Sequence, residues 1–468
     1  MSTNDDHVSF ATIRELGRMI RSGETTPTRL AEHFLGRLET IGPELNAVVT
    51  LTRERAMREA QLAEDELASG YDRGPLHGIP YGAKDLLATA GIPTSWGAEP
   101  LREQIFADDA TAVKKLRDAG AVLVAKLAMI EMAGGMGYNQ PVASLTGAPR
   151  NPWNRESWTG GSSSGSGAAV AAGLVPFAIG SETGGSILSP SSYCGLSGLR
   201  PSYGRISRHG AMALCWTLDK LGPMCHTADD TGIVLQALAG YDPADGSTLQ
   251  QTYRYEPEIA RSSGFRLGVL RQGLDLVQPE VNANFEAACT ALGSVATLEN
   301  VELPDYPYGD IYTLILSSEG AAAFEDLIER GVISGLTAPE DRLGGYAGLT
   351  VTAVEYLRAM RVRRRINDEV DALLSRYDAI VHPATNTVAS PIGVNFDLFA
   401  KPWSRRNTLT SLGNLSGFPA LSVMSGFGER GLPTGMQIAG RVGSESTLIA
   451  VGSAYQQLTD WHDQHPSD

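Results

Sequence analysis

The sequence predicts an α/β fold in which helices pack against a mixed or mainly parallel β-sheet. The first observation is a set of short apolar runs bounded by Gly and Pro, a pattern typical of buried strands. The second is that helical segments alternate with these runs, as in layered α/β proteins. The predicted strands are 121–127, 175–179, 266–270, 379–382 and 420–423, and the helices include 109–119 and 165–172.

A helical lead-in is predicted over about residues 8–70. Thr26 can cap a helix that has Pro27 at its first position, and Gly42 can end it. Apolar side chains at helical spacing form one face of this helix: Leu30, Phe34, Leu38 and Ile41. A charged helix is expected to follow over 52–69.

One domain spanning residues 1–468 is predicted, because no Gly/Ser linker or block of charge divides the chain. Between about 240 and 375 the composition shifts toward helix formers and charged residues. We therefore expect a helical subregion there that covers the functional site, with only a soft boundary at 242–255.

Composition and charge exclude several classes of protein. A chain of 468 residues with 42% hydrophobic residues can bury a large core. Its formal charge of −15 opposes a nucleic-acid surface, which needs clustered Lys and Arg. The polar N-terminus and the lack of a long apolar run predict a soluble, cytoplasmic protein with no membrane partner. Four cysteines without CxxC spacing are expected to be small buried residues rather than disulfides: Cys194, Cys215, Cys225 and Cys289.

Two Gly/Ser loops that flank a small-residue helix and a strand carry the chemical signal, over residues 159–200. In the second loop, Gly184 and Gly185 precede Ser186. Glycines permit tight turns and let a substrate approach consecutive backbone N–H groups, which is the geometry of an oxyanion hole. Ser186 is therefore a candidate nucleophile.

A serine hydroxyl needs a base to become a nucleophile, usually a histidine or an unprotonated lysine. No histidine stands in a motif typical of a triad, although His77, His209, His226 and His382 remain candidates. Lys84 is the lone basic residue in a Gly/Pro-rich, weakly charged stretch. Burial disfavours an ammonium ion, so a buried lysine can titrate near neutral pH and act as a general base.

The chain resembles the amidase signature family over nearly its whole length. The motifs that carry the resemblance occur in order: GIPYGAKD, NPWN, TGGSSSGSGAAVAAG, ETGGSI, CGLSGLRPSYGRIS, GFPALSV and GLPTGMQIAG. The resemblance implies a Ser-cisSer-Lys triad with Ser186 as nucleophile, Ser162 as bridging serine and Lys84 as base. The two serines are 24 residues apart, as they are in the family.

The resemblance also implies the fold and the remaining site residues. It implies a large mixed, mostly parallel sheet that is covered by helices on both sides. Ser163 would support Lys84, and the backbone N–H groups of the turn would form the oxyanion hole: Thr183, Gly184, Gly185 and Ser186. A pocket wall is expected from the loop before the first serine cluster, with apolar contacts from Met132, Ala133, Gly134, Met136 and Tyr138.

Two residues depart from the family pattern. Where many members read D-T-G-G-S-I-R, this chain has Glu182 and Leu188. An arginine at the second position would favour carboxylate-bearing substrates through a bidentate pair. Leu188 therefore predicts a neutral or aromatic acyl group.

The leading hypothesis is a serine hydrolase that cleaves the C–N bond of a neutral small amide through an acyl-enzyme, with water as the acyl acceptor. Esters and carbamates (urethanes) are further candidate substrates. Neither a cofactor nor a metal is expected, and the protein is expected to be a monomer or homodimer. The alternative is an amidotransferase-type subunit that works with a partner on charged tRNA.

The sequence leaves three other hypotheses open. Residues 161–165 match G-x-S-x-G, which would make Ser163 the nucleophile of an α/β-hydrolase with a downstream Asp and His. The same glycines could form a phosphate cradle, but no Lys-Ser/Thr completes that pattern. A binding protein without catalysis is disfavoured because Lys84, Ser162 and Ser186 are all present.

Overall fold

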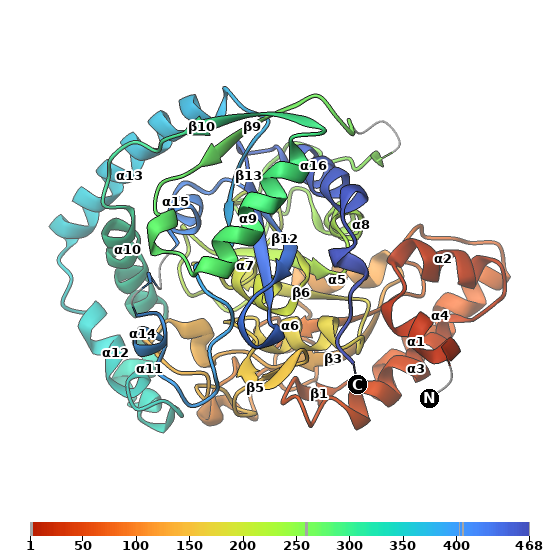
Figure 1. Ribbon diagram of the computed structural model, residues 1–468. Helices are drawn as coiled ribbons and strands as arrows, with labels where there is room; N and C mark the ends of the chain where they lie inside the picture. The colour runs from red at the N-terminus through yellow and green to blue at the C-terminus, as the bar shows by residue number, and fades with distance from the viewer. Residues whose placement is uncertain (1–2, 258–260, 402, 405–406, 468) are drawn as a thin grey trace.

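The computed structural model describes residues 3–257, 261–401, 403–404 and 407–467. Its centre is an eleven-stranded sheet in the order β1-β3-β2-β6-β8-β7-β12-β13-β11-β9-β10 (Figure 1). The strands are β1 Val48–Leu51, β2 Pro80–Lys84, β3 Val122–Leu127, β6 Phe177–Glu182, β7 Ser197–Arg200, β8 Lys220–Cys225, β9 Phe265–Leu270, β10 Ala296–Val301, β11 Ala379–Pro383, β12 Ala420–Phe427 and β13 Pro433–Ala439. A separate two-stranded ribbon pairs β4 Arg150–Asn151 with β5 Asn154–Trp158.

The sheet is mixed, as predicted. Parallel pairing occurs in two blocks of three strands, β3-β2-β6 and β11-β9-β10. The strands between these blocks pair antiparallel, as does β1 at the edge. The expected predominance of parallel pairs therefore holds within the two blocks and not in the centre. There, β12 and β13 are joined by a short turn, and β8 lies between β6 and β7 and runs opposite to both, so antiparallel pairing results.

Both faces of the sheet are buried. In β3, Leu123 belongs to one hydrophobic core, whereas Val122 and Val124 belong to a second core. Because successive side chains of a strand point to opposite faces, the two cores lie on opposite sides of the sheet. The helices are α1 Thr3–Phe10, α2 Ile13–Arg21, α3 Pro27–Thr40, α4 Arg53–Ala68, α5 Thr111–Asp118, α6 Ser164–Ala171, α7 Leu188–Cys194, α8 Ala228–Leu238, α9 Pro279–Leu292, α10 Tyr308–Ala323, α11 Glu325–Glu329, α12 Asp341–Gly348, α13 Ala353–Leu374, α14 Phe396–Phe399, α15 Thr408–Ser416 and α16 Glu445–Leu458.

Helices α2, α3 and α4 form within the predicted helical lead-in over about 8–70, but this segment also contributes strand β1 to the sheet. The Thr26 side chain accepts a hydrogen bond from the backbone N–H of Arg29, and Pro27 occupies the first turn of α3. The predicted helix over 52–69 is α4. Segment 240–375 contains helices α9 to α13, but it also contributes strands β9 and β10 to the sheet (Figure 1).

All four cysteines are buried, as predicted. Within the described ranges, no helix combines the length and the apolar character that crossing a bilayer requires.

Candidate active site

Lys84 is the last residue of β2, which lies between β3 and β6 in the first parallel block. Its Nζ is 2.7 Å from the Oγ of Ser162, 3.1 Å from that of Ser163 and 2.9 Å from that of Ser181. Ser162 and Ser163 directly precede α6, and Ser181 lies on the neighbouring strand β6. At the end of β2, Lys84 therefore contacts both the first serine loop and strand β6.

Lys84 is fully buried and has no carboxylate within ion-pair distance among the described residues. Burial therefore holds the pKa of Lys84 well below its ordinary value, although the negative charges of Asp219 and Glu182 partly oppose this shift. This environment favours the neutral amine of Lys84 over its ammonium form.

The hydroxyl groups around Lys84 determine where its lone pair can point. The hydroxyl of Ser163 donates to the backbone carbonyl of Ser181, and its oxygen accepts from the Ser181 N–H. The proton of Ser163 is therefore already committed. A neutral Lys84 can donate two hydrogen bonds and accept one, so the donor to its lone pair must be Ser162 or Ser181.

Two other lysines are fully buried in the sheet, and among the described residues neither has a side-chain hydrogen bond to the serine loops. The Nζ of Lys126 is 2.9 Å from Asp85 and donates to Thr94 at 2.7 Å. Lys220 has a pKa lowered to about 7 by burial, but its ammonium group donates to the backbone carbonyl of Leu218. Lys84 is the buried lysine whose geometry suits a base for a serine.

Ser186 lies in the turn between β6 and α7. Its side chain is half-buried and lines the large cleft, as does Gly161, which forms a cis peptide bond with Ser162. The backbone N–H of Ser163 donates to the carbonyl of Ser186 at 3.3 Å, which joins the two serine loops. The structure therefore brings Lys84, Ser162, Ser163 and Ser186 into one site.

Gly184 and Gly185 give the turn before Ser186 its shape. Gly185 has φ +109, a conformation that L side chains rarely adopt. At Gly184, a Cβ atom would lie 1.9 Å from the Tyr312 hydroxyl, so the close approach of α10 requires glycine. Thr183, Gly184 and Ser186 all line the cleft, and these are predicted oxyanion-hole residues.

The cleft beside Ser186 has a volume of about 510 Å³. Beyond the serine loops, its described walls come from residues 133–138, from α10, from 384–390 and from the described residues between 396 and 411. Among the described lining residues, Asp397 is the one that carries a formal charge, and most others are hydroxyl, amide, aromatic or small. The described wall is suited to an uncharged group.

The structure divides the predicted pocket residues into two sets. Ala133, Gly134 and Tyr138 line the cleft. Met132 and Met136 are buried in the core behind it, at 1% exposure each. Leu188 is also fully buried in the core and outside the lining, because its backbone N–H is bound by Glu182 at the start of α7. These three side chains pack in the core instead of forming the surface of the cleft.

Sequence analysis missed Ser181, the third hydroxyl on Lys84, and the lining residues of α10. The parallel pairing of Gly82 with Ala178 and of Ala83 with Ile179 places Lys84 opposite Gly180, the residue before Ser181 on β6. A correct register of β2 against β6 could have identified Ser181. Tyr312, Thr313 and Leu316 of α10 carry no local signal, because only the tertiary packing brings them to the turn.

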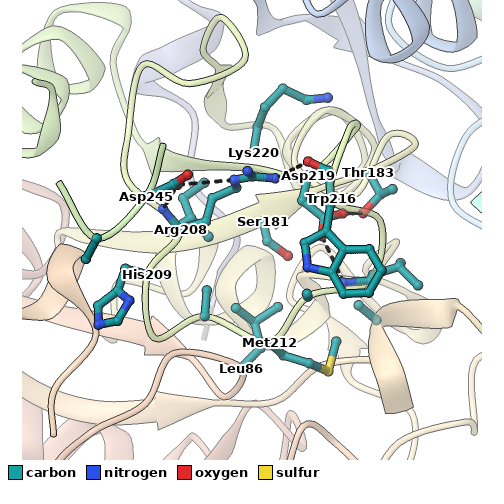
Figure 2. Close-up of a pocket in the computed structure, with 16 residues that line it drawn as sticks. Leu86, Ser181, Thr183, Arg208, His209, Met212, Trp216, Asp219, Lys220 and Asp245 are labelled. Atoms are coloured by element: carbon teal, nitrogen blue, oxygen red, sulfur yellow. Dashed lines mark hydrogen bonds and ion pairs between the residues drawn. The ribbon is translucent and has the colours of Figure 1, made fainter. Parts of the chain in front are cut away.

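A smaller cavity of about 230 Å³ is lined by Ser181 and Thr183, which precede the turn that contains Ser186 (Figure 2). It shares Ala133, Thr183 and Leu214 with the cleft. Thr183 donates to Asp219 at 2.6 Å, and Asp219 also accepts the backbone N–H groups of Leu214 and Cys215. Figure 2 shows Lys220 pointing away from the other lining side chains. The smaller cavity is therefore lined by Thr183 and Asp219, whose hydrogen bond holds the start of the turn that contains Ser186.

The histidine candidates lie elsewhere. The ring of His77 contacts Glu66, and that of His382 contacts Pro383 and Asn407. Burial lowers the pKa of His226 to about 3. His209 lines the smaller cavity (Figure 2). The Ser163 hydroxyl is bound to Lys84 and Ser181, so the geometry does not supply the histidine that a Ser163 nucleophile would need.

The described residues also contain no cluster of three or more His, Cys, Asp or Glu side chains with an arrangement suited to a metal ion.

Comparison with known proteins identifies the family. The Amidase family model matches residues 29–449. A Glutamyl-tRNA(Gln) amidotransferase subunit from Roseiflexus sp. (strain RS-1) is 37% identical, and the match covers 97% of this chain and 98% of that relative.

Solved structures share the fold. The native peptide amidase from Stenotrophomonas maltophilia has a TM-score of 0.84 and 31% identity, with 96% of each chain covered. A Glutamyl-tRNA(Gln) amidotransferase subunit from Thermotoga maritima has a TM-score of 0.79 and 29% identity, with 96% of this chain and 95% of that chain covered. The eleven-stranded sheet, the serine loops around Lys84 and these matches together show that the chain belongs to the Amidase family of amidase signature enzymes.

Proposed function

We propose that this protein hydrolyses the C–N bond of a small uncharged amide through an acyl-enzyme on Ser186. The observation that carries the proposal is the 2.7 Å contact between the Nζ of a fully buried Lys84 and the hydroxyl of Ser162. Lys84 acts as the base, and Ser162 relays the proton between Ser186 and Lys84.

The reaction runs in two halves. Ser186 attacks the carbonyl carbon while its proton passes through Ser162 to Lys84, and N–H groups of the turn stabilise the oxyanion. The protonated Lys84 then returns the proton through Ser162 to the leaving nitrogen, since an amide anion is too basic to leave. Water next attacks the acyl-enzyme, gives its proton to the same base and releases the acid with Ser186 restored.

The many uncharged side chains among the described lining residues of the cleft support an uncharged acyl group. Asp397 is the charged residue among its described lining, whereas Thr385, Asn386, Asn407 and Thr410 offer neutral hydrogen-bonding groups. Aryl esters and carbamates present the same carbonyl to Ser186 with a better or comparable leaving group, so they belong to the candidate substrates.

The first experiment is covalent labelling with a serine-directed fluorophosphonate, followed by peptide mapping. We expect the adduct on Ser186 and no labelling of the Ser186→Ala variant. Ser163→Ala is the matched control, because Ser163 neighbours Lys84 without lining the cleft, and it should still be labelled at Ser186. An adduct on Ser163 would overturn the assignment of the nucleophile.

A second candidate function is the amidase component of an amidotransferase that acts on charged tRNA with a partner protein. The relatives that bear the amidotransferase name, at up to 37% identity over 97% of the chain, favour it. The net charge of −15 opposes direct contact with RNA by this chain.

A substrate panel of aryl amides, primary amides including glutamine, and aryl carbamates separates the two candidates. Turnover of an uncharged amide by the purified chain alone supports the first. Turnover limited to glutamine, and accelerated by an added partner protein, supports the second. A carboxylated amide as the best substrate would contradict an uncharged acyl group.

A further inference from the structure

The side chain of Glu182 binds the backbone directly after Ser186 and so links the two ends of the turn over residues 183–186. Glu182 is the last residue of β6, four positions before Ser186. One of its carboxylate oxygens accepts the backbone N–H groups of Ile187 at 2.9 Å and Leu188 at 3.0 Å, directly after Ser186. The segment that contains the oxyanion-hole residues and Ser186 is therefore fixed at both ends by a single side chain.

The other oxygen of Glu182 is held from outside the turn. It accepts from Arg200 Nη1 at 2.9 Å and from Asn414 Nδ2 at 2.8 Å. Arg200 ends β7 and Asn414 lies on α15, so two distant segments meet at this carboxylate. Arg200 also donates to the carbonyl of Phe418 at 3.1 Å.

The Glu182–Arg200 pair is entirely removed from water, since both side chains are 0% exposed. A buried charge is tolerated when it is paired and hydrogen-bonded, and removing one partner leaves the other uncompensated. Arg200 is also accommodated by a glycine: a Cβ atom at Gly413 would lie 2.1 Å from its Nη2. The Phe418 carbonyl and the space at Gly413 therefore hold the Arg200 guanidinium beside Glu182.

The pair also faces the candidate base. The negative charge of Glu182 raises the proton affinity of Lys84, against the larger effect of burial. Arg200 balances that charge from β7. Glu182 therefore acts on the site in two ways, through the shape of the turn and through the electric field at Lys84, whereas Arg200 acts through the position of Glu182.

We propose that Glu182 and Arg200 are a positioning pair for the nucleophile, with the carboxylate fixing the turn around Ser186 and the guanidinium fixing the carboxylate. This inference rests on the proposed function, because it assigns the pair to a reaction in which Ser186 and Lys84 react. In this chain the cation that pairs with Glu182 is Arg200 on β7, and residue 188 is a buried leucine.

The test compares the pH dependence of kcat/KM for Glu182→Gln and Arg200→Gln with that of the wild type. Both variants should lose about 10²-fold in kcat with a smaller change in KM, because the turn is no longer held in its reactive position. The low-pH limb of the profile reports protonation of Lys84. It should move to lower pH in Glu182→Gln, by on the order of one pH unit, because this variant loses the negative charge that raises the proton affinity of Lys84.

Asn414→Leu tests the geometric part alone, because it removes a donor to the same oxygen without changing charge. This variant should have a lower kcat than the wild type, and the low-pH limb of its kcat/KM profile should stay at the same pH. The matched control is the pair Arg205–Glu445, which is also buried, with the two side chains 3.1 Å apart and outside both cavities. Arg205→Gln and Glu445→Gln should lower thermal stability while leaving the pH profile of the soluble protein unchanged.

The outcomes separate this inference from the proposed function. Glu182→Gln is nearly isosteric and is the deciding variant if Arg200→Gln does not fold. If Glu182→Gln keeps wild-type kcat, or if its limb stays in place while Lys84→Ala is inactive, the positioning role is wrong and the proposed function stands. If Lys84→Ala keeps its turnover, the proposed function itself fails.

Discussion

Lys84 lies at the meeting point of three serine hydroxyls, and its environment makes it testable as a single residue. The kcat of Lys84→Ala should be about 10²-fold to 10⁴-fold lower than that of the wild type, which is the range that general acid–base groups contribute. Lys115→Ala is a suitable control, since Lys115 binds the carbonyls of Leu238 and Ala239 far along the chain from the serine loops. Rates are measured on an aryl amide after circular dichroism shows both variants to be folded. Near wild-type turnover by Lys84→Ala would exclude the lysine as base.

At the scale of residues, the sequence allowed prediction of side chains that belong to contiguous motifs. Ser186 and the glycines before it follow from the second Gly/Ser loop, whereas Ser162, Ser163 and Lys84 follow from the resemblance to the family motifs. Met136 and Leu188 could not be assigned correctly, because an apolar residue near a site looks the same whether it faces the cleft or the core. Only the fold shows that both are buried at about 1% exposure or less.

At the scale of elements, α12 begins with a buried acid that faces another acid. Asp341 and Glu131 are both 0% exposed, and Glu131 accepts the backbone N–H groups of Thr337 and Ala338 at 2.8 Å each. Burial and the neighbouring Glu131 carboxylate raise the pKa of Asp341 to about 9. Glu131 starts the loop that supplies Ala133 and Tyr138 to the cleft, so this acid pair anchors a cleft wall.

The sign of the pH effect follows from proton counting. In the folded protein Asp341 keeps its proton up to about pH 9, whereas in the unfolded chain it loses the proton near its usual value of about 4. The unfolded state therefore binds fewer protons in that window, and the free energy of unfolding falls as pH rises from about 4 to about 9. In Asp341→Asn, the free energy of unfolding should decrease less over this pH range than in the wild type. The decrease is measured by the midpoints of thermal unfolding at pH 5, 7 and 8.5.

The control for Asp341→Asn is Asp310→Asn, which changes an exposed acid in the first turn of α10. It should leave the pH dependence of the midpoint as it is in the wild type. If Asp341→Asn and the wild type lose stability equally between pH 5 and 8.5, the buried acid pair is not the source of the effect.

Element prediction was best where local signals agree. α3, with its Thr cap and Pro at the first turn, and strands β3 and β11 were predictable because each is bounded by clear turn residues. β10 was not predicted, because its sequence ATLENV is polar and half-exposed at the sheet edge within a segment of helical composition. The antiparallel centre also escaped prediction, because strand order depends on contacts between distant segments.

At the scale of the whole molecule, the four cysteines report on the integrity of both cores. Cys194, Cys215, Cys225 and Cys289 are all at most 4% exposed, and burial raises the pKa of each thiol. The native protein should therefore react very slowly with a thiol reagent such as dithionitrobenzoate, and denaturation should release four reactive thiols. Rapid reaction of one thiol in the native state would show that its part of the core opens.

Two stretches of the chain form the cleft, and they contribute different kinds of side chains to it. Lys84, the bridging serines and the nucleophile turn all come from residues 84–186, within one parallel block of the sheet, whereas α10 and 384–411 supply most of the opposite wall. In the proposed reaction, the reacting groups therefore come from the first stretch, whereas the second stretch supplies much of the described wall that an acyl group would contact. A randomised library limited to Tyr312, Thr313, Leu316 and the lining residues of 384–411 would sample new acyl groups without disturbing the base.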